Sequence, residues 1–493
     1  MLVSELLTGL TWSGELPDRE VLGLTADSRQ LEPGWVFVCQ KGLRFDGHDF
    51  AARAVELGAA AVVTDRDLGL PGQILVEDTH LAYPVLCANY FGRPAEKMKF
   101  IGVTGTNGKT TSVFLIKHLL SAAGHRTGLI GTVENQIDTI SLPSKYTTPD
   151  AYQLQSLLAK MAAAGCEYVV MEVSSHALAQ HRVDGLHFEV AVFTNLTQDH
   201  LDFHHTMEEY FAAKRRLFSM CDTAVLNLDD AHGRLLAETL PCRTVTFSDR
   251  TADAGYVAKG IEVRPDGSSF RLVHGDRELP VRIATPGDFS IHNALGAIAA
   301  AVEAGVPLDR AAADIAGCAG VPGRFEVCPN ALGFPVIRDY AHTPDGIEKA
   351  LSTMRSITDA RMTVVFGCPG LRDRSKRAGM AAAVARYADR VILTSDNPRE
   401  EPEMQIIGDA LPGLENSGVD YRVMPDRFAA IETALASCGE GDILLLLGKG
   451  HEDYQVLADG AVYFNEKEIV ADLSARLARQ RNQGSEKESP CSR

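Results

Sequence analysis

The chain has 493 residues, 45% of them hydrophobic, and a formal net charge of −17. A chain of this length is too long for one hydrophobic core, so we expect two to four domains. The negative charge argues against nucleic acid or an anionic membrane surface as a partner, although a local basic pocket for phosphates is compatible with it.

The start of the chain, MLVSELLTGLTWSGE, has neither the basic segment nor the long apolar segment of a secretory signal. No apolar run approaches the roughly 20 residues of a membrane span. The ten cysteines form no C-x-x-C pair. We therefore predict a cytoplasmic protein with free thiols and no membrane partner.

Three segments of the chain have their own pattern of strands and helices. Residues 1–97 alternate short apolar strands with polar turns. Residues 98–322 alternate Val- and Ile-rich runs with helical segments, except for a β-rich stretch near 241–285, and the alternation restarts over 323–480. The polar residues 481–493 predict a disordered tail. The predicted class is α/β with three domains: a smaller amino-terminal α/β domain, a central, mostly parallel sheet with helices on both faces, and a carboxy-terminal Rossmann-like domain.

A candidate phosphate loop follows the strand FIGV, where residues 104–111 read TGTNGKTT and open a helix. Glycines let backbone N–H groups surround phosphate oxygens, a lysine reaches the terminal phosphates, and the next hydroxyl can bind Mg²⁺. The strict pattern G-x-x-x-x-G-K-[ST] needs glycine where Val103 stands, so a structural turn with a coincidental Gly-Lys-Thr is the alternative. The strand–loop–helix context favours a P-loop-type site formed by Gly105, Thr106, Asn107, Gly108, Lys109, Thr110 and Thr111.

Polar groups follow two further buried runs. Glu172 stands near the end of YVVMEV, where a random charge would be costly; it is either a buried carboxylate satisfied by backbone donors or a ligand group. His200 follows the run VAVFTN together with Asp199. His204 and His205 lie nearby, but no cysteine or H-E-x-x-H pattern accompanies them to support a zinc site.

Residues 207–220 read as a helix with one apolar stripe, and Lys214 falls on that stripe. It lies between Tyr210 and Phe218 at helical spacing, whereas Arg215 and Arg216 point elsewhere. A buried lysine is disfavoured unless it is paired or modified. From spacing alone, an ammonium group that reaches the rim of the helix is the favoured explanation.

The stretch TSDNPRE at 394–400 follows the buried run RVIL and carries both charge signs on a turn stiffened by proline. Open α/β sheets place ligands at the carboxyl ends of their strands, so this stretch is either a capped turn or a ligand site. Earlier in the chain, Arg374, Lys376 and Arg377 form a basic run that we expect to be a solvated face.

The motif GTNGKTT in this setting resembles the Mur ligase family, the ATP-dependent amide ligases of peptidoglycan precursor synthesis, and their relative folylpolyglutamate synthetase. Similar motifs extend over nearly the whole chain. They are MEVSSHALAQHRV at 171–183, NLTQDHLDFH at 195–204, HNALGAIA at 292–299, VPGRFE at 321–326, DYAHTPDGIEKAL at 339–351 and DNPR at 396–399.

The resemblance implies that ATP transfers its γ-phosphoryl group to a substrate carboxylate and that an amine then attacks the acyl phosphate. It makes Lys109, Glu172, His200 and Lys214 the expected catalytic residues, with Glu172 and His200 as Mg²⁺ ligands beside Thr110. The family lysine that matches Lys214 is carbamylated to N6-carboxylysine. Such a group can bind a second Mg²⁺, which would explain a lysine on an apolar helix face.

The resemblance also places the two nucleotide substrates. Asn293 matches an adenine contact, Arg324 a phosphate contact and Asp339 a ribose contact, although Arg324 read alone is also compatible with an inter-domain salt bridge. Six positions match the family's contacts with the UDP-sugar peptide: Ser28, Thr147, Thr148, Ser174, Gln180 and Arg182. Read singly, Ser28, Thr147 and Thr148 are equally compatible with turn or N-cap residues.

In the family, DNPR marks the enzymes that take meso-diaminopimelate. This amino acid has an α-amino acid head at each end, so its pocket must hold a carboxylate and an ammonium at the end that does not react. Arg372 and Arg399 are expected to bind that carboxylate and Glu452 the ammonium, whereas lysine would leave both guanidiniums unpaired. The expected diaminopimelate-binding residues are Arg372, Asp396, Asn397, Pro398, Arg399, Gly448 and Glu452.

Within DNPR, Asp396 and Asn397 are expected to face the ammonium, and Pro398 is expected to stiffen the turn. The partner loop, CPGLRD at 368–373, has Pro369 and Leu371 where the family usually has glycine and aspartate. The arginine of this loop is retained.

The expected reaction is the ATP- and Mg²⁺-dependent addition of meso-2,6-diaminopimelate to the D-glutamyl carboxylate of UDP-MurNAc-L-Ala-D-Glu. The alternatives are the same ligation with L-lysine or another diamino acid, and a non-catalytic nucleotide-binding paralogue. A third alternative is folylpolyglutamate synthetase. The DNPR motif and an amino-terminal domain suited to a UDP-sugar both argue against it. We expect small-molecule substrates, no nucleic-acid partner and a monomeric chain.

Overall fold

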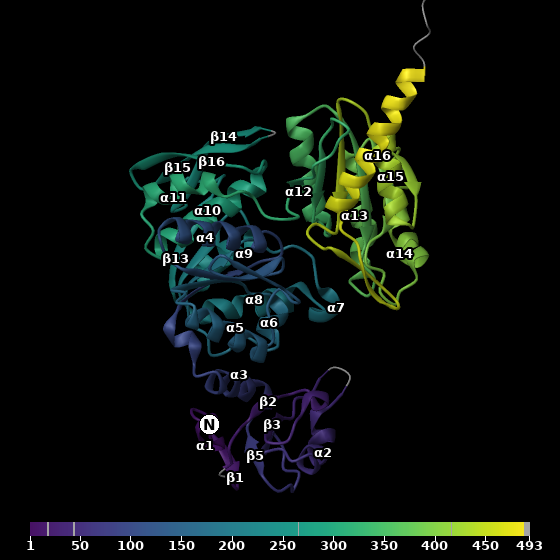
Figure 1. The fold of residues 1–493 in the computed structure, drawn as a ribbon. Helices are drawn as coiled ribbons and strands as arrows, with labels where there is room; N and C mark the ends of the chain where they lie inside the picture. Colours follow the sequence, from purple (N-terminus) through teal and green to yellow (C-terminus); the bar gives the residue numbers. More distant parts are fainter. Residues whose placement is uncertain (17–18, 43–44, 265, 416, 488–493) are drawn as a thin grey trace, which may run out of the picture.

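A computed structural model of the chain describes residues 1–16, 19–42, 45–264, 266–415 and 417–487. It has the predicted α/β class, with three domains that each form around their own sheet (Figure 1). The strands of the three main sheets fall within 1–97, 98–322 and 323–480. The boundaries between the domains stay predictions.

The amino-terminal domain has a five-stranded sheet in the order β1-β5-β4-β3-β2, parallel except for β1. Side chains of β3 alternate between its two faces. Val36 and Val38 pack with α1 and α3, whereas Phe37 packs with α2. The elements are α1 Val3–Leu6, β1 Trp12–Gly14, β2 Gly23–Thr25, β3 Trp35–Val38, α2 Ala51–Glu56, β4 Ala61–Thr64, β5 Gln73–Val76 and α3 Thr79–Tyr90.

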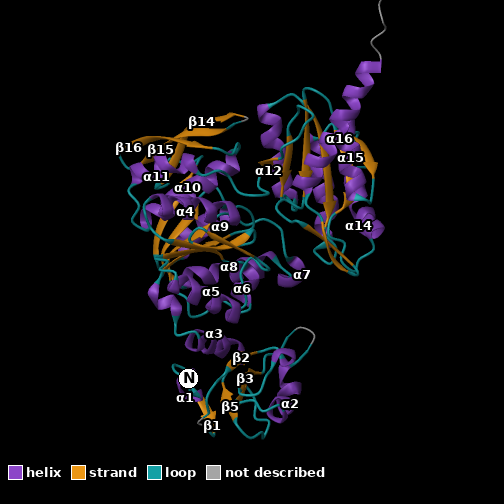
Figure 2. Cartoon of the chain, in the orientation of Figure 1, coloured by secondary structure: helices purple, strands orange, loops and turns teal. Residues whose placement is uncertain are grey.

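The central sheet has eleven strands in the order β16-β15-β14-β13-β12-β11-β6-β10-β7-β8-β9. Strand β6 lies between β10 and β11, and all three are parallel, so their carboxyl ends meet at one edge. Helices cover both faces (Figure 2). The strands are β6 Lys99–Thr104, β7 Thr127–Ile130, β8 Glu134–Ile137, β9 Ile140–Pro143, β10 Tyr168–Glu172, β11 Phe188–Phe193, β12 Cys221–Asn227, β13 Arg243–Ser248, β14 Tyr256–Arg264, β15 Gly267–His274 and β16 Arg277–Ile283.

The helices of the central domain form two layers. Those on one face of the sheet are α4 Lys109–Ala122, α10 Asp288–Glu303 and α11 Leu308–Asp314. Those packed on the other face are α5 Ala151–Ala163, α6 Ser175–Ala179, α8 Met207–Arg215 and α9 Ala231–Thr239, and the short α7 Leu201–His204 precedes α8.

The carboxy-terminal domain has a six-stranded sheet in the order β17-β18-β22-β19-β20-β21, parallel except for β17. Helices α12, α13 and α14 cover one face, and α15 and α16 cover the other. The elements are β17 Glu326–Val327, β18 Val336–Asp339, α12 Pro344–Ile357, β19 Arg361–Cys368, α13 Arg377–Tyr387, β20 Arg390–Ser395, α14 Glu403–Ala410, β21 Asp420–Val423, α15 Arg427–Ser437, β22 Asp442–Leu447, the hairpin β23 Tyr454–Leu457 and β24 Gly460–Tyr463, and α16 Glu466–Lys487.

The last helix, α16, extends to Lys487, so residues 481–487 of the predicted disordered tail are helical. Four of these seven residues, Arg481, Gln483, Glu486 and Lys487, are good helix formers. Residues 488–493 lie outside the described residues. None of the described helices has the length and apolar content that crossing a membrane requires.

A buried ion pair ties together the edge of the carboxy-terminal sheet where β20 and β22 end. Arg427 and Glu466 are both fully buried, with Arg427 Nε 2.8 Å from Glu466 Oε1. Arg427 also donates through Nη2 to the Leu447 carbonyl at 2.9 Å and through Nη1 to the Ser395 carbonyl at 3.4 Å. The guanidinium therefore connects α16 to the last residues of both strands.

We expect Arg427→Met to lower the free energy of unfolding by about 3–5 kcal/mol, because it leaves the Glu466 carboxylate buried without its partner. Replacing both residues, as in Arg427→Met with Glu466→Leu, removes the uncompensated charge and should recover most of that loss. Thermal unfolding of the wild type, the single variant and the double variant measures this. A double variant as unstable as Arg427→Met would contradict the role of the pair.

Candidate active site

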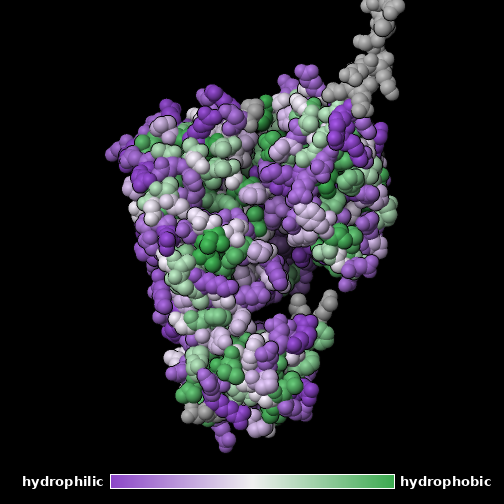
Figure 3. Space-filling view, viewed as in Figure 1, coloured by the Kyte–Doolittle hydropathy of each residue, from purple (hydrophilic) through white to green (hydrophobic). Residues whose placement is uncertain are grey.

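Three cavities lie where the domains meet, and the space-filling view shows the surface hollowed there (Figure 3). The inner cavity, about 200 Å³, is lined by the phosphate loop, Glu172 and His200 of the central domain and by residues of the carboxy-terminal domain. The outer cavity, about 400 Å³, shares Asn107, Gly108 and Arg324 with it. The amino-terminal cavity, about 950 Å³, lies between the first two domains.

The phosphate loop connects β6 to α4 at the centre of the sheet and requires both of its glycines. Gly105 and Gly108 have φ of +148° and +87°. A Cβ atom at Gly105 would lie 1.9 Å from Thr194 Oγ1, and one at Gly108 would lie 2.3 Å from Asn293 Oδ1. The loop can therefore take this shape only with glycine at these positions.

Lys109 folds back over the loop and donates to the carbonyls of Gly105 and Thr106 at 2.9 and 2.8 Å. Burial lowers the pKa of Lys109. The ammonium thus stands beside the backbone amides at the amino-terminal end of α4, the arrangement that binds phosphate groups.

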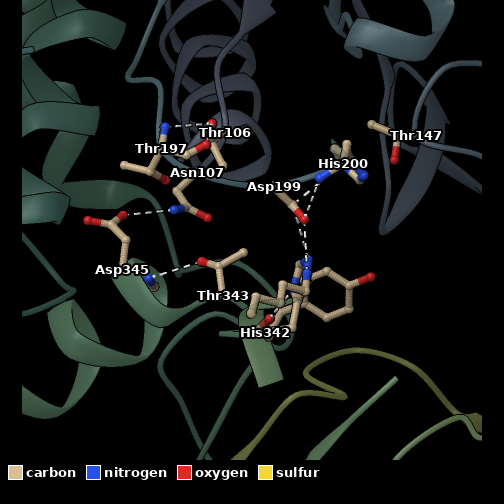
Figure 4. A network of polar contacts seen from close by, with 12 residues as sticks. Thr106, Asn107, Thr147, Thr197, Asp199, His200, His342, Thr343 and Asp345 are labelled. Atoms are coloured by element: carbon tan, nitrogen blue, oxygen red, sulfur yellow. Dashed lines mark hydrogen bonds and ion pairs between the residues drawn. The ribbon is translucent and has the colours of Figure 1, made fainter. Parts of the chain in front are cut away.

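The central and carboxy-terminal domains touch each other directly at this loop (Figure 4). Asn107 Nδ2 donates to Asp345 Oδ2 at 2.9 Å, and Arg324 Nη2 donates to Thr110 Oγ1 at 3.0 Å. The loop is anchored within its own domain through Thr106 Oγ1, which accepts from the Thr197 amide at 3.0 Å. The phosphate loop is therefore part of a domain interface.

Asp199 is the acidic centre of that interface. Its Oδ1 is 2.9 Å from Lys376 Nζ, and its Oδ2 is 3.5 Å from His200 Nε2 and 3.9 Å from His342 Nε2 (Figure 4). Burial acts to raise the pKa of Asp199, but the charges of His200 and Lys376 outweigh it and hold that pKa well below its usual value. The carboxylate is thus held ionised between two domains.

The prediction that Arg374, Lys376 and Arg377 form a solvated face is wrong for two of the three. Only Arg374 is exposed, with 53% of its side chain accessible. Lys376 is buried against Asp199, and Arg377 is fully buried against Glu401 and Asp409. These acidic partners are remote in the sequence, so a local charge pattern does not reveal them.

Glu172 is completely buried at the end of β10, where it lines the inner cavity. Its Oε1 accepts from the Thr132 amide at 2.7 Å, and its Oε2 accepts from Thr132 Oγ1 at 3.1 Å. The carboxylate therefore has hydrogen-bond donors from the protein, which agrees with the interpretation of Glu172 as a buried, satisfied carboxylate. It also faces the phosphate loop across the cavity, so the interpretation as a ligand group stays open.

Lys214 does not reach the rim of its helix. Its side chain is 1% exposed, and its Nζ donates to the Gly105 carbonyl at 2.8 Å and lies 4.5 Å from the centre of the Tyr210 ring. Burial, followed by the nearby Lys109 ammonium, holds the pKa of Lys214 well below its usual value. Lys214 is not among the residues that line the inner cavity, but it contacts the back of the phosphate loop.

The outer cavity contains the three residues predicted for ATP beyond the loop: Asn293, Arg324 and Asp339. Asp339 accepts from the amides of Phe325 and Ala341, both at 2.8 Å, and burial raises its pKa. Arg324 stacks over the Tyr340 ring at 4.6 Å. Its inter-domain contact is thus a hydrogen bond to Thr110 rather than a salt bridge with a described acidic residue.

The six residues predicted for the UDP-sugar peptide do not share one cavity. Ser28, Gln180 and Arg182 line the amino-terminal cavity, and Thr147 lines the inner one. Thr148 is buried and donates to the Glu172 carbonyl at 2.8 Å. Two N-caps are also assigned by the structure: Ser174 caps α6, and Asp150, rather than Thr148, caps α5.

The DNPR loop is organised around a lysine that the sequence interpretation left unassigned. Lys449 is fully buried, and its Nζ is 3.1 Å from Asn397 Oδ1, 3.2 Å from Glu452 Oε2 and 3.8 Å from Asp396 Oδ1. Asn397 Nδ2 also donates to Glu452 at 2.8 Å. Burial, reinforced by the Asp396 carboxylate, raises the pKa of Glu452. The sequence signal for Lys449 was its position between Gly448 and Glu452, both of which were assigned to the pocket.

Gly448, which precedes this lysine, has φ of +109°, and a Cβ there would lie 3.0 Å from Asp396 Oδ2. Pro398, two residues after Asp396 in the DNPR turn, is buried as well. Glycine therefore allows the two strand-end loops to approach each other closely.

Arg372 and Arg399 line the inner cavity from two different loops. Among the described residues, neither has a carboxylate partner; Arg399 Nη1 donates to the Gly370 carbonyl at 2.7 Å. Burial and then the neighbouring Arg372 lower the pKa of Arg399. Two guanidiniums in one cavity form a site for an anion.

The loop between β6 and α4 and the cavity that two domains share define a three-domain α/β protein with a P-loop-type site. The model of the Mur ligase family catalytic domain matches residues 20–82, that of the Mur ligase middle domain 103–301, and that of the Mur ligase glutamate ligase domain 323–450. The chain belongs to the Mur ligase family.

Similar proteins include two enzymes named UDP-N-acetylmuramoyl-L-alanyl-D-glutamate--2,6-diaminopimelate ligase. The enzyme from Syntrophomonas wolfei is 43% identical, and the match covers 96% of this chain and 99% of that enzyme. The enzyme from Caldanaerobacter subterraneus is 41% identical, and the match covers 93% of this chain and 96% of that enzyme. A solved structure with the same name has a TM-score of 0.69 at 32% identity and covers 98% and 99% of the two chains. The structure of the MurF ligase from Thermotoga maritima in complex with ADP has a TM-score of 0.64 at 20% identity, and the match covers 95% of this chain and 100% of that chain. At this identity, the likeness supports a shared fold and nothing further.

His292 of α10 lines the outer cavity next to Asn293 and bridges two carboxylates. Its Nε2 is 2.9 Å from Asp229 Oδ2 and 3.2 Å from Asp249 Oδ1. Burial alone would lower the pKa of His292, but the hydrogen bonds with both carboxylates outweigh it and raise the pKa to about 9. The sequence pattern did not single out this residue, because both partners come from other elements.

A folded-state pKa above the ordinary 6.5 means that His292 contributes its full stabilisation below pH 6.5 and loses it as the pH rises through about 9. We therefore expect the difference in Tm between the wild type and His292→Gln to be largest below pH 6.5 and to shrink as the pH approaches and passes 9. His187→Gln, which removes an exposed histidine paired with Asp222, is the matched control. A difference for His292→Gln that does not change with pH would contradict the charged state.

Proposed function

We propose that the chain is a ligase that uses ATP and Mg²⁺ to add meso-2,6-diaminopimelate to the D-glutamyl carboxylate of UDP-MurNAc-L-Ala-D-Glu in peptidoglycan precursor synthesis. The observation that carries this is the pair of guanidiniums, Arg372 and Arg399, unpaired with described carboxylates in the cavity that contains Lys109 and Glu172. The names of the similar proteins support it and do not favour an enzyme that adds L-lysine.

The reaction needs a carboxylate to become an electrophile. The carboxylate oxygen attacks the γ-phosphorus of ATP, ADP leaves, and an acyl phosphate results. The free amine of the amino acid then attacks the acyl carbon, the C–O bond to phosphate breaks, and the amide forms. The amine proton is lost and phosphate is released. Lys109, the loop amides and Arg324 would stabilise the charge that moves between these oxygens, which their contacts at the loop support.

Binding of ATP follows the two adjoining cavities. Its phosphates would lie on the loop from Gly105 to Thr111, and its nucleoside would lie in the outer cavity, with Asn293 at adenine and Asp339 at ribose. The UDP-sugar peptide would extend from the amino-terminal cavity, where Ser28, Gln180 and Arg182 lie, toward the inner one. The reacting carboxylate would then meet the phosphate loop.

The donor set fits Mg²⁺, which prefers oxygen ligands. The Glu172 carboxylate and the Thr110 hydroxyl both border the inner cavity, beside His200. Lys214 would contribute as a carbamate, and the lowering of its pKa by burial favours the uncharged amine, which is the form that reacts with CO₂. When bound, Mg²⁺ would neutralise phosphate charge.

The diamino acid would bind with its distal carboxylate on Arg372 and Arg399 and its distal ammonium near Glu452 and Asp396. Asn397, Pro398 and Gly448 would shape this pocket. We further propose that the protein is a cytoplasmic monomer whose domains divide near residues 97 and 322.

Ligation assays with meso-diaminopimelate and L-lysine test the proposed specificity. We expect kcat/KM to favour meso-diaminopimelate by at least about 100-fold, since lysine leaves the Arg372 and Arg399 guanidiniums without a carboxylate partner. Arg399→Met should lower that ratio, because it removes one of the two groups that lysine leaves unpaired. A wild-type preference for L-lysine would refute the proposed substrate, and the absence of ATP-dependent ligation would refute the proposed enzyme.

Lys214→Ala should lower kcat by about 100- to 1,000-fold, because the loss removes a group that supports charge stabilisation at the phosphates. Added short-chain carboxylates, such as formate or acetate, should restore part of the activity, since they can occupy the space of the missing carbamate. Lys160→Ala, at an exposed position, serves as the control. Undiminished turnover of Lys214→Ala would exclude the proposed role.

A further inference from the structure

A buried ion cluster lies behind the substrate loops of the carboxy-terminal domain. Arg377 at the start of α13 is 0% exposed, and its Nη1 and Nη2 are each 2.7 Å from one oxygen of Glu401. Its Nη1 also contacts Asp409 Oδ2 at 2.8 Å. The bidentate pairing fixes the orientation of both side chains. We call Arg377 and Glu401 the clamp.

The clamp holds the backbone of the loop that carries Arg372. Arg377 Nη2 donates to the Pro369 carbonyl at 3.1 Å, and Glu401 Oε2 accepts from the Leu371 amide at 2.9 Å. Leu371 has φ of +51° and is half exposed. The left-handed region is unfavourable for a leucine, so contacts from other residues must hold this conformation.

The same loop also makes direct contact with the DNPR turn. The Gly370 amide donates to the Asn397 carbonyl at 2.9 Å, and the Gly370 carbonyl accepts from Arg399 Nη1 at 2.7 Å. A Cβ atom at Gly370 would lie 2.0 Å from the Pro398 carbonyl oxygen. The two loops are therefore packed backbone to backbone, and the clamp lies just beyond this contact.

We propose that Arg377 and Glu401 are positioning residues for the amino-acid substrate: they hold the loop of residues 369–371 so that Arg372 and Arg399 converge on one carboxylate. This rests on the proposed function of the two arginines. The clamp touches no substrate. It acts on a strained loop that has proline and leucine at positions where the family usually has glycine and aspartate.

Steady-state kinetics of Glu401→Gln tests the proposal, because glutamine keeps the size of the side chain and removes its charge. We expect KM for meso-diaminopimelate to rise by about 10- to 100-fold, the scale that a displacement of about 1 Å produces. The kcat and the KM for ATP should stay within about threefold of the wild type. Arg377→Met should show the same separation of constants.

Arg374→Met is the matched control. Arg374 lies three residues before Arg377 and pairs with the same Asp409 at 2.9 Å, but it is 3.9 Å from Glu401 and its side chain is 53% exposed. Its replacement should leave all kinetic constants within about twofold. In the Glu401→Gln background, Leu371→Asn should restore part of the lost affinity, because asparagine adopts the left-handed region more readily than leucine.

The outcomes separate the two proposals. A wild-type enzyme that does not ligate meso-diaminopimelate overturns the proposed function. A wild type that does so, with Glu401→Gln and Arg377→Met indistinguishable from Arg374→Met, overturns the clamp alone. A lower kcat together with a similarly raised KM for every substrate also overturns the clamp, because such a pattern indicates general damage to the fold.

Discussion

The buried ion pair between Asp199 and Lys376 is the contact on which the arrangement of the inner cavity depends. Asp199 precedes His200 in the central domain, and Lys376 belongs to the carboxy-terminal domain, so the pair joins the two halves of the site. An unpaired charge at this depth would cost several kcal/mol, which ties the two domains together at this point. The next residue, Arg377, turns back into its own domain toward Glu401. Lys376 and Arg377 therefore connect the central domain, beside the phosphate loop, to the loops that carry Arg372 and Arg399.

The distribution of charge explains how a chain with a net charge of −17 can receive anionic substrates. The inner cavity gathers Lys109, Arg324, Arg372 and Arg399, and none of the four forms an ion pair with a carboxylate in the described parts of the chain. Burial and then repulsion from the neighbouring Arg372 lower the pKa of Arg399. The site is thus prepared for ligands that carry the missing negative charge, at some expense of stability in their absence.

The sequence was sufficient wherever the signal was local. A strand, two glycines and a lysine predicted the glycine-dependent loop between β6 and α4. An apolar stripe placed Lys214 on the buried helix face, although spacing alone favoured, wrongly, an ammonium group at the rim. It was insufficient where a charge finds its partner far along the chain. Lys376 and Asp199 are 177 residues apart, so a run of basic residues looked like a solvated surface. His292 was missed for the same reason, because its two carboxylates come from separate elements.

The hydrogen bonds within the DNPR turn also differ from those that its sequence indicates. Asn397 is occupied by Lys449, Glu452 and the Val456 amide, so it shapes the pocket and has little capacity left for a ligand. Asp396 is buried, and its Oδ1 has no hydrogen-bond partner among the described residues. Lys449 already pairs with Glu452, which leaves Asp396 as the carboxylate with unused capacity for a substrate ammonium. Asp396 and Glu452 thus lie beside three cations, Lys449, Arg372 and Arg399, and a ligand with both a carboxylate and an ammonium group leaves this balance of charge unchanged. L-lysine would bring a cation without the carboxylate and would leave both guanidiniums uncompensated.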